Sequence, residues 1–333
     1  MQLASWFIEK EDNKVICQLC PHVCHIPEND GGKCRVRVNK EGRLYSANYG
    51  KATAINLDPM EKKPLYHFYP GKNVLSLGTF GCNLHCDFCQ NWQIAHEADF
   101  GRSMLPQEVA ELAHRYYVNQ NSAGVAYTYS EPGMWYEFVV DTAPLVSEYG
   151  LVNVLVTNGY LNKKPFLELL KHVHAFNIDV KAFTDKFYKE KVCGTLKPVL
   201  DNCAAVVEKG RHLEITTLII PGLNDSASEI EELARWIASL DPNIPLHLSR
   251  YYPNYKMHIK ATPLDILEQA WETAREYLGY VYIGNAPELD KSDTLCPVCG
   301  KVLIKRSFYN TYKTGYEGGK CLNCQNHIRG IVE

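Results

Sequence analysis

The sequence predicts an α/β protein whose main domain is a partial, TIM-like (β/α)6 barrel flanked by small cysteine-rich metal-binding segments. Short apolar runs alternate with amphipathic stretches from about residue 73 to residue 284. Most of these runs are followed directly by polar loops. Eleven of the thirteen cysteines fall in three clusters, and two of these clusters lie outside the alternating region. We therefore expect an N-terminal cysteine-rich segment over 1–72, the barrel over 73–290 and a C-terminal module over 291–333.

The strands are predicted from runs that are apolar almost throughout, as in strands covered on both faces. They are NVLSLG (73–78), AGVAYTY (123–129), LVNVLVT (151–157), FNIDVK (176–181), LEITTLII (213–220), PLHLSRY (245–251) and YVYIG (280–284). In the clearest helix, SASEIEELARWIASL, Ser226 and Glu229 are expected to form a capping box. Six strand–helix repeats imply a parallel sheet with right-handed crossovers. The pattern alone allows an open doubly wound sheet or a complete or partial barrel.

Composition and charge exclude several classes of protein. The net charge is −3 and the pI about 6.5, so nothing suggests binding to nucleic acid or to an anionic membrane. We see no apolar run of the length a membrane span needs, and the first residues become charged too early for a signal peptide. We expect a cytoplasmic protein, in which clustered cysteines bind metal rather than form disulfides.

The loop after the first predicted strand carries three cysteines without a fourth nearby. In FGCNLHCDFCQ, Cys82, Cys86 and Cys89 have the spacing C-x3-C-x2-C. Three thiolates on a [4Fe–4S] cube leave one iron open, and an open position characterises a catalytic metal site. The alternative is a zinc site with a distant fourth ligand, His85 or His96. Because ligands bind at the carboxyl ends of parallel strands, this loop and the five polar loops that follow later strands should converge on one rim.

The spacing, with the aromatic Phe88 between the last two cysteines, resembles the radical S-adenosylmethionine (SAM) superfamily. The resemblance implies a partial barrel of the radical SAM type in which SAM completes the cluster. It also implies that the reduced, oxygen-sensitive cluster cleaves SAM to methionine and a 5′-deoxyadenosyl radical, which abstracts hydrogen from a substrate. An electron donor such as ferredoxin or flavodoxin would then be needed.

The later loops resemble the same superfamily and imply contacts to SAM. YTYSEP would place Ser130 and Glu131 on the amino group, and VTNGY would place Asn158 near the ribose. NIDVKAF resembles an element of the glycyl-radical activases, so Asp179 and Lys181 become candidate SAM contacts. TTLIIPGLND resembles the segment along the adenine. These side chains could instead belong to turns, or in the case of Asp179 and Lys181 to a structural ion pair.

One position departs from the activase pattern. The activases carry a SAM-contacting histidine near the end of the sixth strand. In this chain His247 lies on that strand, while the aligned position is nearer Tyr252. His247 is therefore a candidate SAM contact, with a satisfied core histidine as the alternative.

Two further cysteine sets have four members each. The C-terminal set is C-x2-C, 21 residues, C-x2-C, which is typical of a zinc ribbon, with rubredoxin-like iron and ligation by His327 as alternatives. The N-terminal set, C-x2-C-x3-C-x9-C, favours zinc, with an auxiliary cluster as the alternative and with His22 and His25 nearby. The sets are Cys296, Cys299, Cys321 and Cys324, and Cys17, Cys20, Cys24 and Cys34.

The flanking motifs CQLCPHVCHI, KKPLYHFYPG and YVYIGNAP, with the terminal cysteines, resemble the radical SAM enzyme of the AmmeMemoRadiSam system, which is related to pyruvate formate-lyase activating enzymes. This resemblance implies Memo-like and Ammecr-like partner proteins and leaves the substrate open, although a protein residue would suit it. Two rival functions are a glycyl-radical-enzyme activating enzyme and, from another class, a zinc-binding adaptor.

Overall fold

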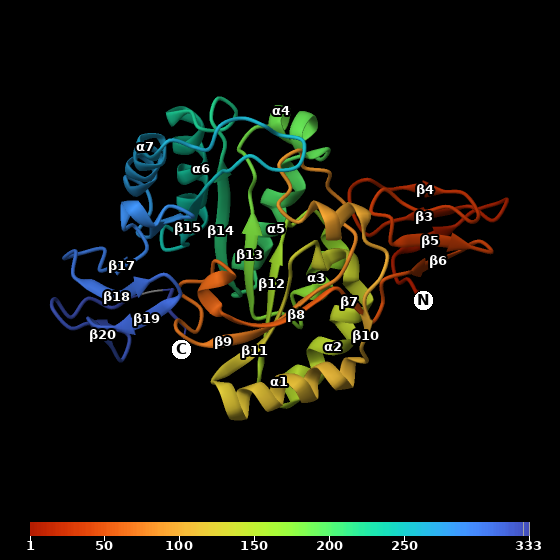
Figure 1. Cartoon of the computed structure of the whole chain (residues 1–333), viewed down its shortest axis with the longest axis horizontal. Helices are drawn as coiled ribbons and strands as arrows, with labels where there is room; N and C mark the ends of the chain where they lie inside the picture. Colours follow the sequence, from red (N-terminus) through yellow and green to blue (C-terminus); the bar gives the residue numbers. More distant parts are fainter. Residues whose placement is uncertain (329, 333) are drawn as a thin grey trace.

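A single large sheet forms the centre of the protein in a computed structural model that describes residues 1–328 and 330–332 (Figure 1). Seven of its eight strands are parallel, and β8 pairs antiparallel with β9 at one edge. In spatial order the strands are β16 (Val281–Gly284), β15 (Leu246–Arg250), β14 (His212–Ile219), β13 (Ala175–Asp179), β12 (Val152–Thr157), β11 (Ser122–Thr128), β9 (Asn73–Gly78) and β8 (Ala54–Pro59). The predicted α/β fold with a parallel sheet is confirmed.

Helices connect successive parallel strands and cover the outer face of the sheet. They are α1 (Pro106–Gln120), α2 (Tyr136–Glu148), α3 (Lys163–Leu169), α4 (Asp185–Phe187), α5 (Lys197–Glu208), α6 (Ala227–Leu240) and α7 (Leu264–Arg275). Short 3-10 or π turns are η1 (Met60–Lys62), η2 (Gln93–Glu97), η3 (Pro132–Trp135), η4 (Tyr188–Val192) and η5 (Pro287–Leu289). Within the described residues, none of the helices has the length and apolar character needed to cross a bilayer.

The start of α6 is fixed partly by a local N-cap and partly by a tertiary hydrogen bond. The Ser226 hydroxyl accepts a hydrogen bond from the Glu229 backbone N–H, as expected of an N-cap. The Glu229 carboxylate, however, accepts a bond from the backbone N–H of Phe183 at 2.7 Å. The predicted capping box is therefore half right, since the glutamate side chain ties α6 to the loop after β13.

The inner face of the sheet is polar although it is buried, which the apolar runs did not indicate. On β14, Leu213, Ile215 and Ile219 belong to the apolar core, whereas Glu214 and Thr216 occupy the intervening positions and are also buried. Side chains alternate between the two faces of a strand, so one face of β14 meets helices and the other carries polar groups. This polar inner face leads to the site described below.

Two small cysteine-containing parts lie on opposite sides of the central sheet in Figure 1. The N-terminal part contains two three-stranded sheets and the β7–β10 pair, and the C-terminal part contains a three-stranded sheet and a two-stranded ribbon. N-terminal strands are β1 (Gln2–Leu3), β2 (Phe7–Glu9), β3 (Val15–Cys17), β4 (His25–Ile26), β5 (Arg37–Lys40), β6 (Arg43–Ser46), β7 (Lys51–Ala52) and β10 (Arg102–Ser103). C-terminal strands are β17 (Thr294–Leu295), β18 (Val302–Ser307), β19 (Asn310–Lys313), β20 (Tyr316–Glu317) and β21 (Lys320–Cys321). Because β8 joins the large sheet, that sheet begins before residue 73, and the division of the chain into three domains stays a prediction.

Candidate active site

A cavity of about 430 Å³ lies at the carboxyl ends of the parallel strands, and its volume is within the usual range for small-molecule sites. Cys82, Cys86 and Cys89 all line it, on the loop that follows β9. Burial, together with the neighbouring Cys89 thiol, raises the pKa of the Cys86 thiol to about 12, although Lys181 opposes the shift. Such a thiol does not ionise unaided near neutral pH, so a metal bound here would have to stabilise its thiolate form.

Backbone hydrogen bonds fix the three-cysteine loop against its surroundings. The N–H of His85 donates to the Val192 carbonyl and that of Asp87 to the Lys191 carbonyl, both at 3.0 Å. The N–H of Lys256 donates in turn to the Asp87 carbonyl at 3.0 Å. These bonds hold the cysteine backbone in place without using the thiols, which therefore remain available as ligands.

The spacing of the three thiols suits a cluster rather than one ion. Within residues 1–328 and 330–332, the loop cysteines do not form a group of three metal-binding side chains with ligand atoms within 4.8 Å of one another, counting histidine nitrogens as well. In a cubane each thiolate binds a different iron, so the sulfurs stand farther apart than around a single ion. His96 stacks between His85 and Tyr255, and neither histidine lines the cavity. This arrangement disfavours the zinc alternative with a histidine as fourth ligand.

Most of the expected SAM contacts are brought together around this cavity. Its lining includes Phe88, Ser130, Asn158, Asp179, Lys181 and His247. The Ser130 hydroxyl donates to the Thr79 carbonyl, and the Asn158 amide donates to Asn83 Oδ1 at 2.9 Å and contacts Cys82 Sγ at 3.7 Å. Phe88 is buried with its ring 5.8 Å from that of Phe187. Side chains from four successive loops thus share one site.

Glu131 lies behind the cavity wall instead of lining it. Its carboxylate accepts hydrogen bonds from the Thr157 hydroxyl at 2.6 Å, the Asn158 N–H at 2.8 Å and the Gly133 N–H at 2.7 Å. Burial raises the pKa of this carboxyl to about 7, although the three hydrogen bonds oppose the shift. In this structure Glu131 therefore holds the loop that carries Asn158.

Asp179 and Lys181 form an ion pair at the end of β13, with Lys181 Nζ 3.0 Å from Asp179 Oδ2. The Lys181 side chain is largely buried, whereas about a third of the Asp179 side chain is exposed. Burial lowers the pKa of Lys181, but Asp179 and Cys86 raise it more, so the amine is charged. The pair faces the same cavity as the three thiols, where each partner keeps some unused hydrogen-bonding capacity.

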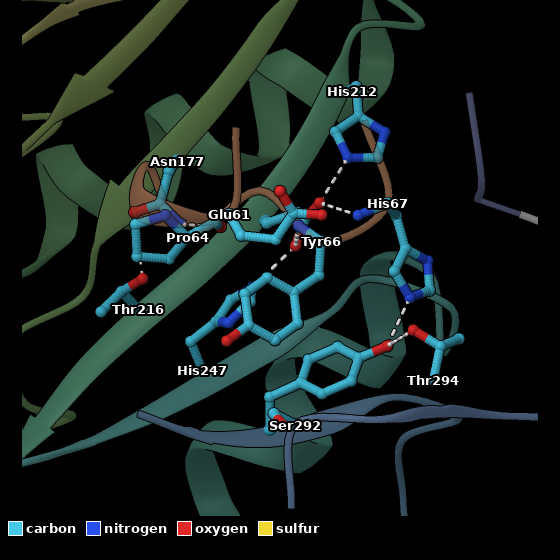
Figure 2. A network of polar contacts seen from close by, with 12 residues as sticks. Glu61, Pro64, Tyr66, His67, Asn177, His212, Thr216, His247, Ser292 and Thr294 are labelled. Carbon is cyan, nitrogen blue, oxygen red and sulfur yellow. Dashed lines mark hydrogen bonds and ion pairs between the residues drawn. The ribbon is translucent and has the colours of Figure 1, made fainter. Parts of the chain in front are cut away.

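His247 belongs to a buried network around Glu214 and also borders the cavity. Glu214 accepts hydrogen bonds from the backbone N–H groups of Tyr66 and His67, at 2.9 and 2.7 Å, and its oxygens lie 3.0 Å from His212 Nε2 and 2.7 Å from His247 Nε2. Figure 2 shows Tyr66, His67, His212 and His247 grouped together in this network. Burial alone would raise the pKa of Glu214, but the histidine contacts hold it well below its usual value. One ring nitrogen of His247 is thus bonded within the core, as the alternative of a satisfied core histidine predicts.

Several residues in or behind the cavity wall were not identified from the sequence. Asp58 on β8 accepts hydrogen bonds from Lys63 at 2.7 Å and from the Tyr129 hydroxyl, and Lys63 lies 4.5 Å from the centre of the Tyr129 ring. Tyr129 has a φ of 74°, which is rare outside glycine and occurs at functional sites. Glu214 gave a signal in retrospect, because a lone acid in the apolar run LEITTLII needs buried partners.

The C-terminal cysteines form a compact four-thiol site. The Sγ atoms of Cys296, Cys299, Cys321 and Cys324 all lie within 4.8 Å of one another. Two pairs are 3.6 and 3.7 Å apart, as expected of sulfurs about 2.3 Å from one central tetrahedral ion. These residues fit a single metal ion, while the described His327 is not part of the group.

The N-terminal cysteines gather in a second, wider arrangement beside the active-site loop. Cys17, Cys20 and Cys34 are buried and Cys24 is partly exposed. The His22 ring is 2.7 Å from the Asn83 carbonyl, next to Cys82. His25 lies on β4 with an exposed side chain.

Comparison with known proteins agrees with this geometry. A sequence model of the radical SAM superfamily matches residues 76–237. The chain is 42% identical to an uncharacterized protein of Methanocaldococcus jannaschii over 98% of this chain and 99% of that protein. It is 30% identical to the pyruvate formate-lyase-activating enzyme of Clostridium pasteurianum over 48% of this chain and 67% of that enzyme. The fold resembles Streptococcus suis SuiB bound to S-adenosylmethionine, with a TM-score of 0.53 and 17% identity over 67% of this chain and 54% of that one.

The chain belongs to the radical SAM superfamily. It is an enzyme related to those that activate glycyl-radical enzymes, and the adaptor alternative from the sequence is not supported. The radical SAM fold implies a [4Fe–4S] cluster and SAM.

Proposed function

We propose that this enzyme binds a [4Fe–4S] cluster through Cys82, Cys86 and Cys89 and uses SAM to abstract hydrogen from a substrate. The observation that carries the proposal is that three thiols, too widely spaced for one ion, line the same cavity as the polar ends of the following strands. When bound, the cluster and SAM together would supply a 5′-deoxyadenosyl radical.

The chain's own residues would bind and orient the cofactor. Asp179 and Lys181 present opposite charges to the cavity, which suits the amino and carboxylate groups of an amino acid. Asn158, fixed by Asn83, would contact the ribose, and Ser130 would lie near the amino group. Glu131 would act indirectly by positioning Asn158, since its oxygens are already bonded to the protein. His247, held in place by Glu214, would border the SAM site.

The substrate we propose is a residue in a partner protein. Two related enzymes, the pyruvate formate-lyase-activating enzyme and a putative glycyl-radical enzyme activating enzyme, are named for acting on proteins. Tyr309, at the turn between β18 and β19, lines the cavity yet is half exposed, so a bound partner could reach the site over this turn. Motifs in the terminal segments support membership in the AmmeMemoRadiSam subgroup, with Memo-like and Ammecr-like proteins as partners.

The C-terminal four-thiol site would hold zinc, because the spacing and the thiolate set suit that ion. A small one-electron donor such as ferredoxin or flavodoxin would reduce the enzyme in the cytoplasm. Activation of a glycyl-radical enzyme is the second candidate, favoured by the 30% identity to an activating enzyme.

The direct test is the formation of 5′-deoxyadenosine from SAM after anaerobic reconstitution and reduction with dithionite. The wild type should form it, the Cys86→Ala variant should not, and the matched control Cys203→Ala should behave as wild type because Cys203 is buried in α5 away from the cavity. A fully loaded wild type that leaves SAM intact, alone and with a Memo-like protein added, would contradict the proposal. A glycyl radical on an added partner, detected by electron paramagnetic resonance (EPR), would select the second candidate.

A further inference from the structure

The four N-terminal cysteines form one cluster of side chains, which differs from the C-terminal set in its spacing. The backbone N–H of Cys17 donates to the Cys24 carbonyl at 2.9 Å, and that of Val23 donates to the Cys20 carbonyl at 3.2 Å. A Cβ at Gly32, two residues before Cys34, would lie 3.6 Å from Cys24 Sγ. The four cysteines therefore lie close together.

These thiols are nevertheless too far apart for a single ion. In the described chain, the C-terminal cysteines form a group with all ligand atoms within 4.8 Å, whereas no three of the N-terminal cysteines do. The C-terminal set serves as an internal reference, because it shows the spacing that this chain adopts where one tetrahedral ion fits. The N-terminal spacing instead resembles that of the three-cysteine loop, whose thiols line one cavity but do not form such a group.

A buried cation with unused donors adjoins this cluster of thiols. Arg37 is 2% exposed, and its Nη1 donates to Glu137 Oε1 at 2.7 Å. Its Nε and Nη2 are buried and have no hydrogen-bond partner among the described residues. Arg37 is close enough to Cys17 and Cys34 to lower the pKa of both thiols. Glu137 balances the charge, but the two free donors of the buried guanidinium still need acceptors, which the thiolate ligands of a cluster would provide.

The N-terminal set is packed directly against the active-site loop. Gly81, which precedes Cys82, has a φ of 90°, and a Cβ at this position would lie 2.9 Å from the Cys34 carbonyl oxygen and 2.4 Å from Val36 Cγ1. The His22 ring contacts the Asn83 carbonyl at 2.7 Å. His85 Nε2 lies 3.2 Å from the Lys33 carbonyl. Residues next to the N-terminal cysteines thus contact residues next to Cys82 and Cys86.

We infer that Cys17, Cys20, Cys24 and Cys34 bind a second [4Fe–4S] cluster rather than zinc, beside the first. All four of its irons have protein ligands, so this cluster has no open position for SAM. Its role rests on the proposed function: one electron from a small protein donor would reduce the second cluster, and the same electron would then pass to the first. The second cluster would return to its oxidised state in each cycle.

The decisive variant removes the first cluster and leaves the N-terminal set untouched. After anaerobic reconstitution and desalting, the wild type should hold about eight iron and eight sulfide per chain, and the triple variant Cys82→Ala, Cys86→Ala, Cys89→Ala should retain about four of each. Adding Cys34→Ala to the triple variant should remove the remaining sulfide. Zinc in place of iron in the triple variant, or iron without sulfide, would overturn the inference.

The metal content separates this inference from the proposed function. If the triple variant keeps its cluster while the wild type does not cleave SAM, the second cluster stands and the proposed function fails. If the wild type cleaves SAM while the triple variant holds zinc, the proposed function stands and the second cluster is ruled out. SAM should change the EPR spectrum of the reduced wild type and leave that of the triple variant unchanged.

Two further readouts test the neighbours of the second cluster. In the triple-variant background, Arg37→Gln should lower the midpoint potential of the remaining cluster, because a positive charge that favours the reduced form is lost, and Arg37→Lys should largely preserve it. An unchanged potential in Arg37→Gln would place Arg37 away from the cluster. In the fully reduced wild type, the two clusters should broaden each other's EPR signals, and two independent signals would contradict their adjacency.

Discussion

Asp179 tests whether an ion pair in the cavity wall also binds the cofactor. Replacing it with asparagine keeps the side-chain shape but removes the negative charge. We expect Asp179→Asn to weaken SAM binding about 10- to 100-fold, because a hydrogen bond to a charged group contributes about 1.5–3 kcal/mol. Equilibrium dialysis with labelled SAM on the cluster-loaded protein would measure this change.

The matched control is Asp201→Asn, which breaks a Lys–Asp pair of 2.7 Å on the exposed surface of α5. Its effect on SAM binding should be negligible. If Asp179→Asn binds SAM as tightly as the control and only its melting temperature falls, the pair is structural.

Glu214 concentrates buried polar contacts on one carboxylate. Replacing it with glutamine places an amide N–H₂ among groups that donate to the carboxylate, so we expect the free energy of unfolding at pH 7 to fall by about 3 kcal/mol. Urea unfolding under anaerobic conditions would measure this loss. Glu231→Gln, which removes an exposed acid paired with Arg235, should leave the free energy of unfolding almost unchanged.

The same residue gives a pH dependence with a definite sign. The folded-state pKa of Glu214 lies well below its ordinary value, so its ionised form stabilises the fold above the unfolded-state pKa. The difference between wild type and Glu214→Gln should therefore shrink below about pH 4, as the unfolded and then the folded carboxyl become protonated. A difference that grows below about pH 4 would show that this sign is wrong.

At the scale of single residues, the sequence predicted which side chains surround the cavity better than it predicted their hydrogen bonds. Asn158, Asp179 and Lys181 could be predicted because their motifs occur in fixed order after successive strands. The position of Glu131 behind the wall could not, because it depends on the Thr157 hydroxyl and two backbone N–H groups from different loops. Lys63 and Asp58 were missed because the segment around β8 lacks the apolar pattern of the other strands. In addition, β8 runs antiparallel to its neighbour β9.

At the scale of elements, alternation of apolar runs and amphipathic stretches was sufficient to predict the seven parallel strands. Each predicted run overlaps its observed strand, since buried parallel strands have a strong composition signal. β8 was not predicted, because its sequence AINLDP carries polar residues and pairs antiparallel at the edge of the sheet. Which face of β14 would be polar also required the tertiary structure, because burial of Glu214 depends on partners from distant segments.

We expect the C-terminal module to depend on the metal ion proposed for its four thiols. It has short strands, and its small core is shared with Tyr280 and Tyr282, so metal binding would supply much of its folding free energy. We expect the variant Cys296→Ser with Cys324→Ser to be cleaved within 291–332 at least about tenfold faster than the wild type, because local unfolding exposes the backbone. Limited proteolysis followed by mass spectrometry would locate the cuts.

The control for this experiment is Cys203→Ser, which alters a buried cysteine outside the three sets. Its cleavage pattern should match the wild type. Iron bound at the active-site loop should be unchanged in the double variant, since that loop makes its own contacts. Equal protease resistance of the double variant and the control would show that the module folds without its metal.

At the scale of the whole molecule, Arg306 joins the C-terminal module to the cavity wall. It lies on β18, is 3% exposed, and donates to the Tyr66 carbonyl at 2.6 Å and the Thr294 hydroxyl at 2.7 Å. Its guanidinium also lies 4.3 Å from the centre of the Tyr66 ring. Through the Tyr66 and His67 N–H groups, the same segment reaches Glu214, so one polar network extends from the module to β14 (Figure 2).

We expect Arg306→Met to lower the free energy of unfolding by about 3–5 kcal/mol, because it removes one member of a buried charged network and leaves the Tyr66 carbonyl without its donor. Arg235→Met, which removes an exposed arginine from α6, should leave the free energy of unfolding almost unchanged. Since Tyr66 lines the cavity, Arg306→Met should also reduce the rate of SAM cleavage with the cluster still loaded, whereas Arg235→Met should not. Urea unfolding and 5′-deoxyadenosine formation, measured on the same preparations, test both effects. A loss of stability without any change in SAM cleavage would mean that the module braces the sheet but does not shape the active site.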